Sequence, residues 1–132
     1  MIGLDTNIIL RAVLNDDAVQ SPQAQACLIS LNEQRKGFIS LGVILEIYWV
    51  LDHRYKLSKD LICQTFKQLL RVEWLEFDSF DELVRALDLY KIGKIDLSDA
   101  LIAEQNLQRG CAITLTFDKS AAKQIPSMEL LT

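Results

Sequence analysis

MIGLDTNIIL, residues 1–10, contains a single charged residue, Asp5, within otherwise apolar sequence. Its first residues, Met1–Leu4, predict a very short strand, and an apolar helical segment follows from about Asn7 to Leu14. Carboxylates are almost never fully buried unless they are paired or bound to a cation, because moving a charge out of water costs much free energy. Asp5 is therefore a candidate functional residue at the carboxyl end of a strand.

Three other acidic residues also stand alone beside or inside apolar runs. Glu46 is the only charge in GFISLGVILEIYWVL (residues 37–51), Asp99 leads the run ALIA, and Asp118 ends the run CAITLTF. Oxygen ligands are those that Mg²⁺ prefers, and a few carboxylates suffice because the ion keeps several waters. Without a cation, two carboxylates about 4 Å apart repel by roughly 4 kcal/mol at an effective dielectric constant of 20. The four acids therefore favour a shared Mg²⁺ or Mn²⁺ site, the chemistry of phosphodiester cleavage.

The rest of the chain alternates predicted strands with predicted helices. The further strands are Gly37–Ser40, Val72–Phe77, Ala112–Thr116 and Met128–Leu131. The first three further helices are predicted from Ser21-Pro22 to Glu33, over Leu41–Tyr55, and over Lys59–Leu70, the last with Ser58 as its N-cap. The next begins at Ser79 with a capping box and ends near Tyr90, before Gly93. The last two run from Leu97 to Gln108, with Asp96 before it and Gly110 after it, and over Lys119–Lys123.

This alternation predicts an α/β fold with a central parallel sheet of four to five short strands, helices on both faces, and a single domain over residues 1–132. Ligands of such sheets bind beyond the carboxyl ends of the strands. Asp5 and Asp118 follow the first and fourth strands, Glu46 lies in the helix after the second, and Asp99 lies in the first turn of a helix. We therefore expect the four carboxylates to converge on one edge of the sheet.

The composition is that of an ordinary globular protein, with 50% hydrophobic and 24% charged residues among 132. No segment reaches the roughly 20 apolar residues of a membrane span, and no secretion signal is visible, so we expect a cytoplasmic protein without membrane contact. The three separated cysteines are expected to be reduced.

The net charge of −4 argues against a general nucleic-acid binder. It is compatible with a nuclease whose bound metal ions offset part of the negative charge, and it would suit a basic protein partner.

Each acid also has a purely structural interpretation. Asp5 and Asp118 could cap the helices that follow them, and Asp99 could interact favourably with a helix N-terminus. Glu46 could pair with a distant arginine. Asp96 is at least as well explained as a helix N-cap as by any role in a metal site.

Five segments resemble those of the PIN-domain ribonucleases, specifically the VapC-type toxins of bacterial toxin–antitoxin pairs. They are LDTNIILR (4–11), NDDAVQSPQA (15–24), ISLGVILEIYWVL (39–51), IDLSDALIAEQNLQRG (95–110) and TLTFDK (114–119), in the family's order and spacing. Many relatives carry a Phe shortly after the TFDK-like segment, where this chain has Ser120-Ala121-Ala122. This departure concerns the rim of the site and leaves the metal chemistry intact.

The resemblance implies a three-layer PIN-like fold and metal-dependent endonucleolytic cleavage of RNA, in which a metal-activated water leaves a 5′-phosphate. It also implies a homodimer that a cognate antitoxin neutralises. The residues it implies are catalytic, metal-binding acids at Asp5, Glu46, Asp99 and Asp118, a secondary acid at Asp96, and supporting residues at Thr6, Asn7 and Thr116.

Other residues near these acids are weaker candidates. Arg11, Lys94 and Lys119 could hold RNA phosphates or could be solvated surface charges. Trp49 and Trp74 are expected in the core or at a subunit interface, with base stacking as the alternative. His53, the only histidine, is expected to be an exposed helix-end residue, with a general base as the alternative.

Two other functions compete with a ribonuclease toxin. One is a PIN-like binding module that has lost activity, although an inactive domain would have no use for the repulsion among four acids. The other is a phosphotransferase or phosphatase with Asp5 as nucleophile. Asn7 argues against it, because haloacid-dehalogenase-type enzymes need a second Asp at that position.

Overall fold

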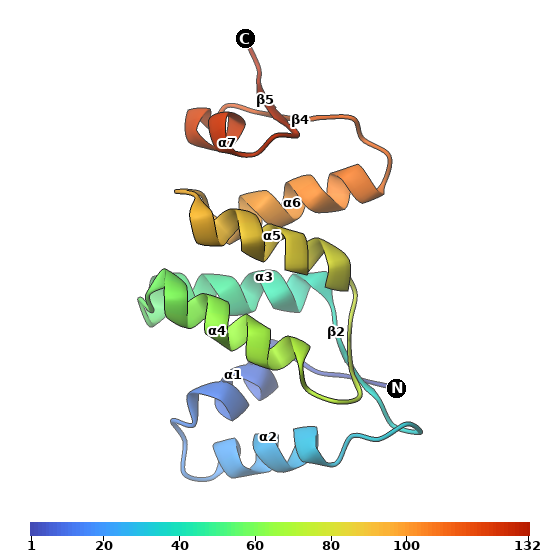
Figure 1. Ribbon diagram of the computed structural model, residues 1–132. Coiled ribbons are helices and arrows are strands. Elements are labelled where there is room, and N and C mark those ends of the chain that lie inside the picture. The colour runs from blue at the N-terminus through green and yellow to red at the C-terminus, as the bar shows by residue number, and fades with distance from the viewer. The chain divides into compact units, whose positions relative to one another are not determined.

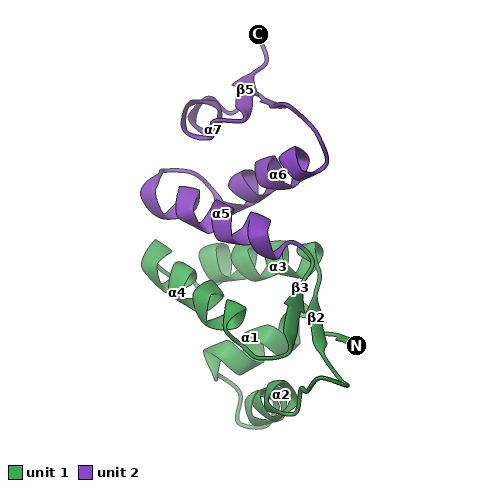
Figure 2. Ribbon diagram, turned by 45° about the vertical axis from the view of Figure 1, so that its right-hand side comes forward, with its two compact units in different colours: residues 1–78 green, residues 79–132 purple.

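The computed structural model describes all of residues 1–132, and the chain divides into two compact units, Met1–Asp78 and Ser79–Thr132 (Figures 1 and 2). The first unit contains β1 (Ile2–Gly3), α1 (Thr6–Leu14), α2 (Gln20–Ile29), β2 (Gly37–Ile39), α3 (Leu41–Trp49), the π-helix η1 (Val50–Arg54), α4 (Lys59–Leu70) and β3 (Leu75–Phe77). The second contains α5 (Phe80–Ile92), α6 (Leu97–Gln108), β4 (Thr114–Thr116), α7 (Lys119–Gln124) and β5 (Met128–Leu130).

The sheet of the first unit has the strand order β1-β2-β3, and both pairs are parallel. Ile2 aligns with Gly37, and Gly37 aligns with Leu75. A Cβ at Gly37 would lie 3.0–3.1 Å from side-chain atoms of Leu4, Leu31 and Leu75, so any larger residue would require these leucines to shift away from the middle strand. The core beside the sheet includes fully buried side chains from α1, β2, α3, η1 and α4: Ile9, Ile39, Ile44, Ile47, Leu51, Ile62, Phe66 and Leu69.

The second unit is built on helices α5 and α6, which pack side by side, and on the parallel pair β4–β5 with α7 as its crossover (Figure 2). Leu83 and Leu101, one from each helix, are fully buried. Arg85 of α5 donates a 2.7 Å hydrogen bond to the Glu104 carboxylate of α6, which ties the two helices together on their more exposed side.

The α/β class and the parallel pairing predicted from the sequence are confirmed, and every predicted strand and helix is present. The strands differ from the prediction in one respect, because they form a three-stranded and a two-stranded sheet rather than one sheet of four to five strands. The strands are only two or three residues long, so each ladder contains few hydrogen bonds.

Helix α2 begins one residue before the predicted N-cap. The Asp17 carboxylate accepts hydrogen bonds from the backbone N–H groups of Val19 (2.9 Å) and Gln20 (2.7 Å), so Asp17 supplies the cap that was predicted for Ser21. The Ser21 side chain is buried and instead accepts a hydrogen bond from the Asp17 backbone N–H at 3.2 Å. The prediction was wrong because a capping carboxylate upstream of Ser21-Pro22 was overlooked.

Other boundaries follow local backbone geometry. The predicted helix over 41–55 is continuous, but its last turn is π-helical, with the Tyr55 N–H bonded to the Val50 carbonyl. The predicted strand over 72–77 starts only at Leu75, because Trp74 has a positive φ of 66° that an extended strand does not allow. None of the helices combines the length and the apolar character needed to cross a membrane.

Candidate functional site

Asp5 and Glu46 are linked in the first unit through the residue between them in space, Thr6. Asp5 caps α1, and its carboxylate accepts a 2.7 Å hydrogen bond from the Thr6 backbone N–H. The Thr6 hydroxyl donates a 3.1 Å hydrogen bond to Oε2 of Glu46, and Thr6 itself is only 7% exposed. One buried threonine therefore holds the loop after β1 and the middle of α3 in register, with a carboxylate on each.

The position of Glu46 follows from the way α3 forms. The Ser40 hydroxyl caps the helix by accepting a hydrogen bond from the Val43 N–H at 3.3 Å, which fixes where the first turn begins. Ile44, Ile47 and Tyr48 then form the buried face of the helix, and Glu46 falls on its exposed side. The Glu46 carboxylate makes no ion pair, so the alternative in which it pairs with a distant arginine is not realised here.

Asp96, Asp99 and Asp118 influence one another in the second unit. Asp96 occupies the N-cap position of α6 but makes no capping hydrogen bond, and Asp99 lies in the first turn of the same helix. Burial raises the pKa of the Asp99 carboxyl, and the negative charges of Asp96 and Asp118 raise this pKa further. The Asp99 carboxylate makes no ion pair. Its place in the first turn of α6 is favourable to a negative charge, but this does not outweigh burial and repulsion, since the pKa is raised.

Asp118 is fixed more firmly than Asp99. Its carboxylate caps α7 by accepting a 3.0 Å hydrogen bond from the Ala121 N–H. Its own backbone N–H donates to the Thr116 hydroxyl at 3.0 Å, so Thr116 at the end of β4 orients the loop from which Asp118 projects. The structural interpretation of both Asp5 and Asp118 as helix caps is therefore confirmed, and it is compatible with a second role because a carboxylate has more than one free lone pair.

These residues fit a hard divalent cation in their chemistry. All of the candidate donors are carboxylate oxygens, and one of them, Asp99, is partly desolvated beside two like charges, which a cation would relieve. As they stand, no three Asp, Glu, His or Cys side chains lie at the spacing of a shared ion. The acids are divided between the units, with Asp5 and Glu46 in the first and the other three in the second, and their convergence on one ion stays a prediction.

The sequence matches the PIN domain family over residues 2–125, which is nearly the whole chain. This chain belongs to the PIN domain family. PIN domains are generally nucleases, and those nucleases typically use divalent metal ions and bind RNA. Comparison with curated proteins gives no match.

Among the predicted RNA-binding residues of this PIN domain, Arg11 is already engaged. Its guanidinium forms a 3.0 Å ion pair with Asp16 and donates a 2.9 Å hydrogen bond to Gln20. The hydrogen bond from Arg11 lowers the pKa of the Asp16 carboxyl, as does a further hydrogen bond from the Tyr55 hydroxyl at 3.1 Å. Arg11 thus secures the loop between α1 and α2, and is neither a free surface charge, which was the alternative to phosphate binding, nor an unoccupied cation.

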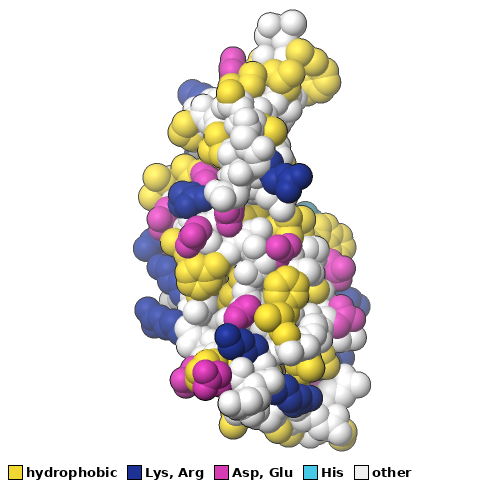
Figure 3. All heavy atoms as spheres, turned by 90° about the vertical axis from the view of Figure 1, so that its right-hand side faces the viewer, with side chains coloured by type: hydrophobic (Ala, Val, Ile, Leu, Met, Phe, Trp, Pro, Cys, Tyr) yellow, Lys and Arg dark blue, Asp and Glu magenta, His cyan; other side chains and the backbone are white.

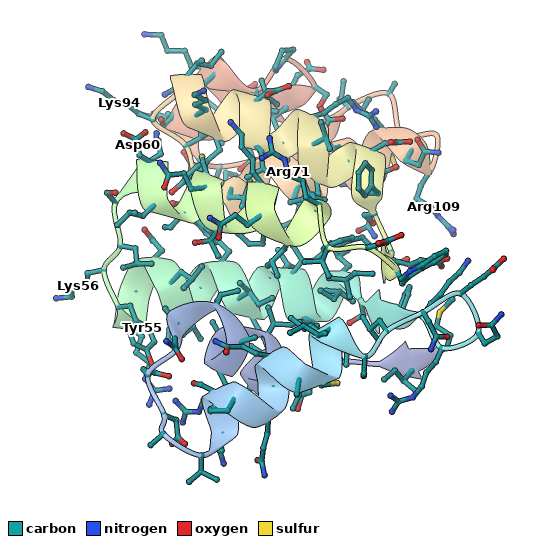
Figure 4. All side chains as sticks on the ribbon, turned by 60° about the horizontal axis from the view of Figure 1, so that its bottom comes forward. Tyr55, Lys56, Asp60, Arg71, Lys94 and Arg109 are labelled. Carbon is teal, nitrogen blue, oxygen red and sulfur yellow. The ribbon has the colours of Figure 1, made fainter.

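Lys94 and Lys119 remain available for a ligand. Both are exposed and neither makes an ion pair, and Figure 4 shows the Lys94 side chain extending away from the ribbon. The Lys94 backbone is held to α7, because its N–H donates to Gln124 at 2.6 Å and its carbonyl accepts from the Ser120 hydroxyl at 3.3 Å. Elsewhere charges of both signs are scattered, and Figure 3 shows acidic and basic side chains interspersed over one face of the molecule.

Ser120 and Gln124 were missed by the reasoning from sequence. The Gln124 amide donates to the Ser120 hydroxyl at 3.0 Å, and both residues bind the backbone of Lys94. Ala121 between them is buried, and the hydrogen bonds of Ser120 and Gln124 hold α7 to the loop before α6. The signal that could have found this contact is Gly93, where a Cβ would lie 2.7 Å from the Gln124 side-chain oxygen.

Proposed function

We propose that this PIN domain is a Mg²⁺- or Mn²⁺-dependent endoribonuclease that acts as the toxin of a toxin–antitoxin pair. Asp5, Glu46, Asp99 and Asp118 are the proposed metal ligands and catalytic residues, with Asp96 in a secondary role. The observation that carries the proposal is the placement of these acids within a PIN domain. Asp5 and Asp118 each follow the end of a strand, and Thr6 draws Glu46 to the loop that holds Asp5.

The surrounding residues have roles that their contacts support. When bound, the divalent ion supplies positive charge beside the scissile phosphate and a bound water of lowered pKa. Thr6 orients Glu46 and Thr116 orients Asp118. Asn7, exposed in the first turn of α1, lies two residues after Asp5. Lys94 and Lys119, exposed and without ion pairs, bind RNA phosphates in this proposal, and Arg11 acts mainly on the fold.

The toxin role rests on the resemblance of five sequence segments to VapC-type toxins. It brings with it a homodimer, a cytoplasmic location and a cognate antitoxin whose C-terminal segment covers the site. A chain of net charge −4 is suited electrostatically to a basic partner segment. We further propose that residues 1–132 work as one PIN domain, because the family match runs through both units.

An inactive PIN-like binding module is the second candidate, and one observation favours it. Asp5 and Asp118 each cap a helix, so both carboxylates have a structural use that persists without catalysis. Asp99 distinguishes the two candidates, because it makes no stabilising contact in the protein.

The experiment is cleavage of total RNA by purified protein in Mg²⁺, in Mn²⁺ or in EDTA. The wild type is compared with Asp99→Asn and with Asp88→Asn, a matched control at an exposed position on α5 of the same unit. Cleavage that needs metal, survives in Asp88→Asn and is lost in Asp99→Asn supports the ribonuclease. Absence of cleavage in folded, metal-loaded, antitoxin-free wild type supports the binding module.

A further inference from the structure

Two aromatic rings are stacked on the surface at the carboxyl end of α3. The ring centroids of Trp49 and His53 lie 5.1 Å apart, and the ring planes differ by 12°. Trp49 is 57% exposed, and the His53 side chain is 51% exposed. Ile47 and Leu51 form the buried face of the same continuous helix, so the stacked pair does not fill the core. Another aromatic ring can stack on an exposed tryptophan that is held in a fixed orientation.

The stacked pair continues the helix face on which Glu46 lies. Residues three or four apart in a helix share a face, and Trp49 is three residues after Glu46 while His53 is four residues after Trp49. At about 1.5 Å of rise per residue in α3, the Trp49 backbone lies roughly 4.5 Å along the axis from that of Glu46. The His53 ring lies a further 5.1 Å from the Trp49 ring. A nucleotide chain with one phosphate near Glu46 therefore has neighbouring bases within reach of the rings.

The charges beside the rings suit a polyanion. Arg54 and Lys56 follow the stack and make no ion pair. Two acids contact this segment: Asp52 lies 3.4 Å from Nδ1 of His53, and Asp16, already paired with Arg11, accepts a 3.1 Å hydrogen bond from the Tyr55 hydroxyl. Figure 4 shows Tyr55 and Lys56 at this end of the helix, with the Lys56 side chain extending outward. The turn itself is π-helical over Val50–Arg54, a rare geometry that is frequent at functional sites.

We propose that the Trp49–His53 stack binds an unpaired nucleobase of the RNA substrate, while Arg54 and Lys56 contact the adjoining phosphates. This inference rests on the proposed ribonuclease function and adds a recognition element to its site. Base–aromatic stacking tolerates every base, so the platform contributes affinity and register rather than a sequence. A second copy of the chain is the competing occupant, but a two-fold contact of this surface with itself would bring the unpaired cations Arg54 and Lys56 towards like charges.

The chain contains two tryptophans, which makes the test selective. The Trp74→Phe variant leaves Trp49 as the only tryptophan, and Trp49→Phe leaves only Trp74. Each variant is titrated at low temperature in Mg²⁺ with unstructured uridylate and adenylate dodecamers, with RNA integrity checked on a gel. Tryptophan fluorescence reports stacking, and anisotropy of end-labelled RNA reports the Kd.

We expect saturable quenching in Trp74→Phe and none in Trp49→Phe. Trp49→Ala should raise the Kd roughly 5- to 100-fold for both dodecamers, the range for loss of one stacked base. Trp49→Phe should raise it less, because a smaller ring remains. Quenching that is absent in Trp74→Phe, with a Kd for Trp49→Ala within twofold of the wild type, overturns the inference. If Trp49→Ala also converts a dimer to a monomer in sedimentation while RNA affinity is unchanged, the stack is a contact between copies.

The failure of this inference is distinguishable from failure of the proposed function. If cleavage needs metal and is lost in Asp99→Asn, but RNA does not quench Trp49, the ribonuclease proposal stands and the proposed base stacking on Trp49 and His53 is rejected. Quenching of Trp49 by RNA without any cleavage retains the platform on a domain that binds RNA and does not cut it.

Discussion

The Thr6 hydroxyl donates a 3.1 Å hydrogen bond to Glu46, forty residues further along the chain. This hydrogen bond to the Glu46 carboxylate starts from a buried residue next to Asp5. The orientation of one proposed ligand therefore depends on the loop that carries another.

Thr6→Val removes this hydrogen bond while keeping the shape of the side chain. We expect the free energy of unfolding to fall by about 1 kcal/mol, as for loss of a typical hydrogen bond. RNA cleavage should fall about tenfold, because Glu46 loses its fixed position. Urea unfolding and initial cleavage rates measure the two effects. Thr6→Ser keeps the hydroxyl and should stay near wild type; equal losses in both variants would count against an orienting role.

Asp99→Asn should stabilise the metal-free protein and abolish cleavage. The pKa of Asp99 is raised in the folded state, so between its ordinary and raised values the folded protein binds more protons than the unfolded chain. Asp99 therefore lowers stability as pH rises through the raised pKa. At neutral pH the gain on substitution should be at most about 1 kcal/mol, because solvent screens a charge that is only partly buried. Urea unfolding of both proteins from pH 4 to 7 tests this, and curves that stay parallel would contradict it.

Two substitutions of Asp118 should distinguish its role as a helix cap from its role as a charged metal ligand. Asparagine is as good a helix N-cap as aspartate, so Asp118→Asn should keep α7 stable while losing the proposed ligand. Asp118→Ala loses both and should destabilise the protein by roughly 0.5–2 kcal/mol. Thermal unfolding and RNA cleavage distinguish the variants. Full cleavage by a stable Asp118→Asn protein would remove Asp118 from the proposed metal site.

Divalent metal should stabilise the folded protein by mass action. At a free metal concentration 100 times the Kd, the expected gain is about 2.7 kcal/mol. Thermal unfolding in Mn²⁺, in Mg²⁺ and in EDTA measures it, and Asp99→Asn should show a much smaller increase in Tm. An equal increase in the wild type and in Asp99→Asn would point to metal bound elsewhere.

Arg11→Gln should weaken the fold in a pH-dependent way. Arg11 lowers the pKa of Asp16 in the folded state, so their interaction adds stability above the ordinary pKa of Asp16 and loses it as pH falls through the lowered value. The variant should be less stable than wild type at pH 7 and should approach it in acid. Its Kd for RNA should stay near wild type, in contrast to Lys94→Gln and Lys119→Gln. A Kd for RNA that rises as much as in the lysine variants would indicate that Arg11 binds RNA.

Local signals predicted the elements of this fold well. Ser58 caps α4 as expected, since its hydroxyl accepts from the Leu61 N–H at 3.2 Å, and the alternation of strands and helices correctly indicated parallel pairing. The start of α2 was less accessible, because the choice between Asp17 and Ser21 depends on which side chain becomes buried. The positive φ of Trp74 has no signature in its residue type.

The candidate site was predicted in its residues and less well in their surroundings. The isolation of Glu46 within apolar sequence suggested a core-like position, yet Glu46 is exposed, because its apolar neighbours turn inward on the other side of α3. The contact from Thr6 to Glu46 joins segments forty residues apart, and no local pattern encodes it. The contact of Gln124 with Lys94 spans thirty residues and was missed for the same reason.

The capping role of Asp118 affects how activity would be lost in descendants of this chain. A lineage that stops cutting RNA still needs a side-chain oxygen at position 118 to cap α7, so selection for folding alone favours Asp, Asn, Ser or Thr there. Position 99 has no such protection, because its carboxylate caps no helix and makes no ion pair, and burial and its acidic neighbours raise its pKa. Among relatives with this geometry, a neutral residue in place of Asp99 is the substitution that would mark a nuclease turned binding protein.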